Sequence, residues 1–164
     1  MKNTWIFILL ATFSVWSCKD KKKQDPTPAQ TQMEKLTGSY SSTSSRTWTV
    51  KSIFFETTED RTASWPGFSL TLSTNGSGSN TYASSNELAG GPWPATGSWS
   101  FGGTADVPDI TTLVRDDGLE MNVIINTATT PNTLVLTFTF DDTVHQTGKM
   151  DAINGEYVFT LESN

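Results

Sequence analysis

The sequence predicts an all-β domain built as a single antiparallel meander of about eight strands. Apolar and polar residues alternate with a period of two through most of the chain after residue 47, which is the pattern of a strand with one buried face. Turn residues separate these segments at intervals of about ten residues. No helical pattern of useful length lies between them, and this excludes the parallel sheets of βαβ folds.

The first elements follow from short local signals. Met33–Leu36 predicts one short helical turn at the N-terminal side of the domain. Trp48–Phe55 is the first strong alternating segment, and Phe68–Leu72 is the second. Asn75-Gly76 is a hairpin signal, so the chain is expected to return as a third strand over Thr81–Ala83.

The later part of the chain carries the clearest strand patterns. Ile110, Thr112 and Val114 lead into Asp117-Gly118, the strongest hairpin signal of the chain. The remaining five strands are expected over Thr96–Phe101, Ile110–Val114, Leu119–Asn126, Leu134–Phe140 and Gly155–Leu161.

The N-terminus has the features of an export signal. Lys2 precedes an apolar stretch from Trp5 to Trp16, which has the length of a secretory signal and is too short to span a bilayer. Val15-Trp16-Ser17-Cys18 resembles the lipobox of bacterial lipoproteins. The resemblance implies that Cys18, the single cysteine of the chain, is acylated and becomes the first residue of the mature protein. An ordinary signal peptide with an incidental cysteine is the alternative.

These signals divide the chain into three parts. Residues 1–17 are the expected lipoprotein signal peptide, and residues 18–32 are the expected acylated cysteine and flexible tether. Residues 33–164 form the β domain. The expected location of the protein is the cell envelope, with a lipid anchor in the outer membrane. The sequence leaves open whether the domain faces the periplasm or the cell surface.

Composition excludes several classes of function. Residues 34–164 carry six basic and fifteen acidic side chains, a net charge of −9, so no basic footprint exists for a nucleic acid. One cysteine and one histidine, His145, cannot form a usual zinc site. The acidic pairs 116–117 and 141–142 lack the spacing of a calcium loop, and turns commonly carry such residues. No metal and no cofactor is expected.

The overall plan also resembles that of small lipocalin-like lipoproteins of the Bacteroidetes. Leu36-Thr37-Gly38-Ser39-Tyr40 is similar to the short helix and Gly-x-Trp opening of lipocalin-like domains, with Tyr40 in place of the tryptophan. The segment 155–161 supplies a closing Gly-x-Tyr-x-Phe-x-Leu strand. The resemblance implies a closed barrel in preference to a β-sandwich.

Two of the six tryptophans lie outside the segments in which apolar and polar residues alternate. Trp65 and Trp93 each precede a proline in a loop, where an aromatic ring either packs inward as a plug or is displayed to a ligand. A lipocalin-like barrel would bind its ligand through the inward faces of two late strands. The candidate ligand-binding residues are therefore Trp65, Trp93, Val123, Ile125, Leu136 and Phe138.

We therefore expect a monomeric, membrane-anchored and non-catalytic β domain that binds a small apolar or amphipathic ligand. The alternative is a β-sandwich that acts as an interaction module for a glycan or an envelope protein complex. A hydrolase is the third hypothesis, since paired carboxylates can cleave glycosides. However, the sequence has no nucleophile elbow and no phosphate loop.

Overall fold

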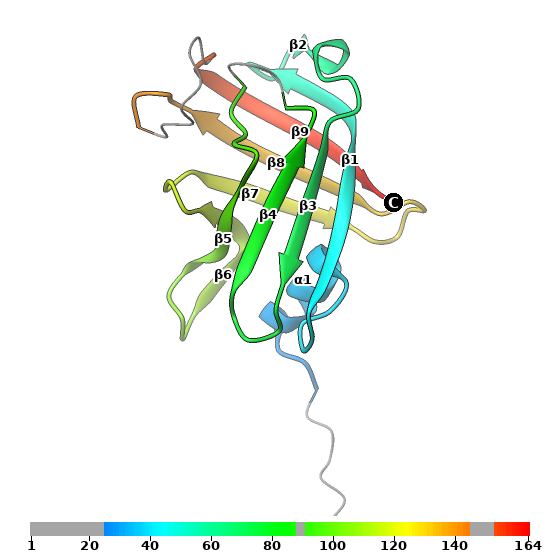
Figure 1. The fold of residues 1–164 in the computed structure, drawn as a ribbon, viewed down its shortest axis with the longest axis vertical. Helices are drawn as coiled ribbons and strands as arrows, with labels where there is room; N and C mark the ends of the chain where they lie inside the picture. The colour runs from blue at the N-terminus through cyan, green and yellow to red at the C-terminus, as the bar shows by residue number, and fades with distance from the viewer. Residues whose placement is uncertain (1–24, 88–90, 145–152) are drawn as a thin grey trace, which may run out of the picture.

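The computed structural model describes residues 25–87, 91–144 and 153–164 as one closed antiparallel β-barrel (Figure 1). Neighbouring strands pair in the order β1-β3-β4-β5-β6-β7-β8-β9, and β1 also pairs with β9, which completes the ring. The two-residue strand β2 extends the edge of β1. The predicted all-β meander and its closure as a barrel are confirmed, and the β-sandwich alternative is wrong.

The described elements run from residue 28 to residue 163. In chain order they are α1 (Pro28–Thr37), β1 (Ser44–Phe55), β2 (Glu59–Asp60), η1 (Thr62–Ser64), β3 (Ser69–Thr74), β4 (Asn80–Ser85), β5 (Thr96–Gly103), β6 (Pro108–Arg115), β7 (Glu120–Asn126), β8 (Thr133–Phe140) and β9 (Gly155–Ser163). A segment that begins at residue 19 therefore contains every one of these elements.

The connections gather at the two ends of the barrel because successive strands run in opposite directions. The helix α1 and the β3–β4 and β5–β6 connections lie at one end, here called the α1 end (Figure 1). The alternation of strand direction assigns the β7–β8 connection to the same end. The connections that contain Trp65 and Trp93 lie at the other end, here called the loop end. Among the described residues, no helix is long and apolar enough to cross a membrane.

The helix α1 is longer than the single turn expected from Met33–Leu36. Thr27 caps its N-terminus, since the Thr27 side chain accepts from the Gln30 backbone and the Gln30 side chain accepts from the Thr27 backbone. Pro28 occupies the first turn, where its missing N–H costs nothing. Residues 28–32, expected to belong to the flexible tether, are therefore helical, because the capping box outweighs their polar composition.

The C-terminus of α1 is tied to the first strand by alternate side chains of β1. Ser44 Oγ donates to the Thr37 carbonyl at 2.7 Å. Arg46 donates to the Lys35 carbonyl at 2.6 Å, and Trp48 Nε1 donates to the Leu36 carbonyl at 3.1 Å. These three donors satisfy carbonyls that a helix end otherwise leaves unpaired. The arrangement places α1 across its end of the barrel, with the side chain of its own residue Leu36 fully buried.

Two irregularities change which side chains face the interior. A register shift between Val50 and Ser52 interrupts the alternation of β1, so Trp48 and Ile53 are both buried. A larger shift in the β5–β6 pairing, between Phe101 and Gly102, leaves residues 110–112 without partners in that pairing. Leu113 and Arg115 are therefore the buried residues of β6, and not the Ile110, Thr112 and Val114 set that strict alternation selects. Bulges redirect side chains in this way.

Candidate functional site

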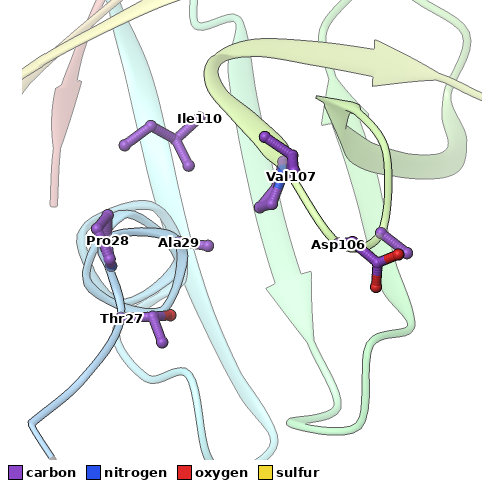
Figure 2. Close-up of a pocket in the computed structure, with 8 residues that line it drawn as sticks. Thr27, Pro28, Ala29, Asp106, Val107 and Ile110 are labelled. Carbon is purple, nitrogen blue, oxygen red and sulfur yellow. The ribbon is translucent and has the colours of Figure 1, made fainter.

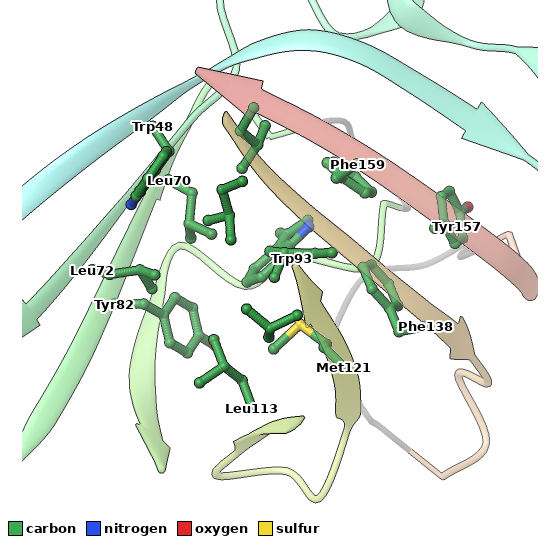
Figure 3. Close-up of a cluster of buried hydrophobic side chains, with 14 of the residues drawn as sticks. Trp48, Leu70, Leu72, Tyr82, Trp93, Leu113, Met121, Phe138, Tyr157 and Phe159 are labelled. Carbon is green, nitrogen blue, oxygen red and sulfur yellow. The ribbon is translucent and has the colours of Figure 1, made fainter. Parts of the chain in front are cut away.

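The barrel interior is filled by an aromatic cluster that centres on Trp93 (Figure 3). The Trp93 ring centroid lies 5.7 Å from that of Tyr82 and 6.0 Å from that of Phe138. It lies 6.1 Å from that of Phe159. Trp65 enters from the neighbouring connection, with its ring 5.2 Å from Phe159 in an edge-on arrangement. Such edge-to-face contacts are favourable for aromatic rings.

Both loop tryptophans are thus plugs. Trp65 and Trp93 are each 1% exposed, so the hypothesis that they are displayed to a partner is wrong. Their loops fold inward at the loop end, while α1 covers the α1 end. Among the described residues, the barrel is therefore covered at both ends.

The four strand residues predicted to line a pocket face the interior. Val123, Leu136 and Phe138 are buried, and Ile125 is partly buried against the same cluster. Side chains from the loop end occupy the space beside them, since Phe138 contacts the Trp93 ring directly. Ligand binding by these residues stays a prediction, and it would require the loop that carries Trp93 to move.

Arg115 fixes the Trp93 loop from inside the barrel. Its side chain is fully buried and forms a two-point ion pair with Asp117. The guanidinium also donates to the Pro92 carbonyl at 2.6 Å and lies 5.3 Å from the Trp93 ring centroid. A charged donor in this position holds the loop by hydrogen bonding and by a cation–π contact at once. No sequence pattern indicates this role, since Arg115 directly precedes the Asp116-Asp117-Gly118 turn and is expected there to be exposed to solvent.

Some polar groups of the interior lack partners within the described residues. The Tyr82 hydroxyl and Trp93 Nε1 are buried without a hydrogen bond, whereas the Tyr157 hydroxyl donates to the Ile153 carbonyl at 2.8 Å. Gly97 makes room for Tyr82, because a Cβ at Gly97 would lie 2.5 Å from the Tyr82 hydroxyl oxygen. Burial raises the pKa of Tyr82 and of Tyr157 to about 12.

Removal of the two hydroxyls should have opposite effects on stability. Tyr157→Phe is expected to lower the free energy of unfolding by about 1 kcal/mol, because the partly buried hydrogen bond to the Ile153 carbonyl is lost. Tyr82→Phe is expected to leave it unchanged or raise it, because a buried hydroxyl with no partner is removed. Urea unfolding at neutral pH, followed by far-ultraviolet circular dichroism, measures both. A comparable loss in the two variants would show that the Tyr82 hydroxyl has a partner.

The same tyrosines predict a loss of stability at alkaline pH. An unfolded tyrosine has a pKa near 10, and both folded values are about 12, so the folded barrel retains these protons more tightly. Their contribution is complete below pH 10 and is lost as the pH rises towards 12. Tyr82→Phe should therefore reduce the slope of unfolding free energy against pH in this window.

Aspartates of the pairs 116–117 and 141–142 stabilise turns. Asp116 accepts from the Ser98 backbone at 2.9 Å, and Asp117 pairs with Arg115. Asp141 accepts from the Thr143 backbone at 2.9 Å. Within residues 25–87, 91–144 and 153–164, no group of three or more histidine, cysteine or acidic side chains could hold a metal ion. Cys18 and His145 lie outside the described residues.

An apolar hollow lies outside the barrel, between α1 and the β5–β6 hairpin (Figure 2). We call it the α1 groove. It has a volume of about 470 Å³, which is within the range of sites for small ligands. Thr27 and Asp106 contribute its polar lining, and the other lining residues are Pro28, Ala29, Ala105, Val107, Pro108 and Ile110.

A second hollow of about 200 Å³ continues along α1 and shares Ala29 and Pro108 with the first. Its further lining includes Met33, Tyr40 and Phe101. The two hollows follow one side of the helix, with the barrel strands opposite.

Sequence reasoning did not find the α1 groove, because it depends on two features that alternation conceals. The first is the extension of α1 back to Pro28. The second is the irregular β5–β6 pairing, which lets Pro108 and Ile110 face the helix while Leu113 faces the interior. The Thr27-Pro28-Ala29-Gln30 capping box could have signalled the first feature. Gln32 Nε2 joins the two walls by donating to the Ile110 carbonyl at 3.2 Å.

Comparisons with known proteins give no relative for this chain. No protein-family model matches it, and no curated protein or solved structure shows significant similarity to it. The closed meander barrel with a short N-terminal helix is consistent with the lipocalin-like plan.

Proposed function

We propose that the protein is a cell-envelope lipoprotein, anchored through Cys18, whose non-catalytic β-barrel binds a small apolar or amphipathic molecule in the α1 groove. The observation that carries the binding function is the apolar lining of this groove, formed by Pro28, Ala29, Val107 and Ile110 among others. The anchor rests on the apolar leader and on the resemblance of Val15–Cys18 to a lipobox.

The groove is a better candidate for the ligand than the barrel interior. Interior binding would displace Trp93 from ring contacts with four aromatic neighbours and would break its contact with Arg115. Binding in the groove requires no such rearrangement, because the hollow already exists. A preformed site avoids the free-energy cost of reorganisation.

The residues available do not favour the other two hypotheses. A glycan module would need exposed aromatic rings, and Trp65 and Trp93 are both buried. A hydrolase would need a held nucleophile or a poised acid pair. Asp116 and Asp117, the acidic pair that precedes Gly118, are engaged in structural contacts.

A blocking substitution tests the groove. Ala29 lines both hollows, and Ala29→Phe should fill the space between α1 and the hairpin. We expect the affinity for a fluorescent lysophosphatidylcholine, used below its micelle concentration, to fall about tenfold or more, since a loss of 1.4 kcal/mol suffices. The measurement is fluorescence titration of the unacylated segment 19–164.

The matched control is Ala83→Phe, the same change at an exposed position on β4. This variant should bind the probe as the parent segment does. Equal affinity of the parent and Ala29→Phe would place binding elsewhere and would contradict the groove as the ligand site.

A further inference from the structure

We propose that the α1 groove takes an acyl chain of a phospholipid in the bilayer that carries the anchor, so that the barrel rests on the membrane with its α1 end. This inference rests on the proposed anchoring through Cys18, and it names the ligand class of the proposed groove. The occupant is thus a membrane lipid with its headgroup at the bilayer surface.

The groove lies close to the expected anchor along the chain. Pro28 lies ten positions after Cys18, and a chain of that length reaches at most about 35 Å. Pro28 is itself part of the groove wall. An anchor at Cys18 therefore keeps the α1 groove close to the membrane surface, whereas the loop end lies across the length of the barrel.

An exposed apolar residue lies at the edge of the groove. Val107 is 74% exposed at the β5–β6 hairpin and lines the groove (Figure 2). Ala105 and Pro108 flank it in the same lining. An exposed apolar side chain at the edge of an apolar hollow suits the headgroup boundary of a bilayer, where such side chains leave water.

Ile124 provides the contrast within the same domain. It is 61% exposed on the outer face of β7. Its neighbours on that face, Asn122 and Asn126, are polar and exposed. Isolated exposed apolar residues are ordinary on protein surfaces, so Ile124 indicates no docking site.

Charge indicates the kind of headgroup. Asp106 lies in the groove lining, and the domain that surrounds it carries a net charge of −9, so an anionic headgroup would be repelled. A zwitterionic phospholipid fits this charge, with its ammonium group towards Asp106.

Fluorescence quenching by labelled lipid tests the inference on the acylated chain. Cys18 is the single cysteine, and acylation removes its thiol, so Val107→Cys gives one site for an environment-sensitive fluorophore. The protein is reconstituted into vesicles of phosphatidylethanolamine and phosphatidylcholine that contain lipid with a nitroxide on its acyl chain. Ile124→Cys, labelled in the same way, is the matched control.

We expect the label at position 107 to lose most of its emission and the label at position 124 to retain it. Equal quenching at the two positions, or quenching at neither, in protein that floats with the vesicles overturns the inference and leaves the anchor intact. Acylated protein that fails to float overturns the anchor and the inference together. Unchanged near-ultraviolet circular dichroism of the tryptophans verifies that both variants are folded.

Discussion

Trp93→Ala is expected to lower the free energy of unfolding by about 3–5 kcal/mol, the usual cost of removing a large buried aromatic side chain. Trp93 is 1% exposed and contacts Tyr82, Phe138 and Phe159 at ring distances of 5.7–6.1 Å. The cavity would open at the centre of the cluster. Collapse of the closed barrel around it would be limited, because each of the eight strands that form the ring is paired on both sides.

Urea unfolding followed by far-ultraviolet circular dichroism measures this cost, with Ile124→Ala as the control. Ile124 is 61% exposed, so its truncation should change stability by no more than about 0.5 kcal/mol. A loss below about 1 kcal/mol for Trp93→Ala would mean that the ring is not part of the packed interior. It would also reopen the hypothesis that the ring is displayed to a partner.

Asp117→Ala is expected to cost about 3 kcal/mol, because it leaves the buried Arg115 cation without its counterion. The Arg115 side chain is fully buried, and that of Asp117 is 20% exposed. This partial exposure places the cost at the low end of the range for broken buried pairs. The Pro92 carbonyl would remain as a neutral acceptor for the guanidinium.

A double-mutant cycle separates the free-energy cost of the uncompensated Arg115 charge from the other effects of the Asp117 substitution. Arg115→Met combined with Asp117→Ala should be more stable than Asp117→Ala alone, because the orphaned charge is gone. Asp116→Ala is the control, since Asp116 accepts a hydrogen bond from the exposed Ser98 and its loss should cost about 1 kcal/mol. Strict additivity of the Arg115 and Asp117 substitutions would show that the pair is not coupled.

The sequence predicted the fold well where alternation is unbroken. Leu134, Leu136, Phe138 and Phe140 alternate without interruption, and all four are buried. In a strand with one wet face, the period of two specifies which side chains point inward. The number of strands and the absence of intervening helices left a barrel and a sandwich both open, and it was the resemblance to lipocalin-like domains that favoured the closed barrel now observed.

Prediction from the sequence failed where a bulge, or a contact between residues far apart in the chain, determines which side chains face the interior. The shift in β1 buries both Trp48 and Ile53, which strict alternation places on opposite faces. The buried Arg115 holds the loop that carries Trp93 through its hydrogen bond to the Pro92 carbonyl. Arg115 and Pro92 are 23 positions apart in the sequence. Local patterns contain no information on such a pair. The α1 groove was missed for the same reason, because its two walls come from distant parts of the chain.

The hydrogen bonds between α1 and β1 also determine how the domain responds to mechanical force. A pull on the N-terminal segment acts first on α1, and it passes to the barrel through Ser44, Arg46 and Trp48. Load would be distributed over three donors before it reached the sheet. The strand that receives it, β1, is held by β3 on one side and β9 on the other. Its extraction would have to break two rows of backbone hydrogen bonds at once, so the three donors add to a resistance that every strand of the closed barrel shares.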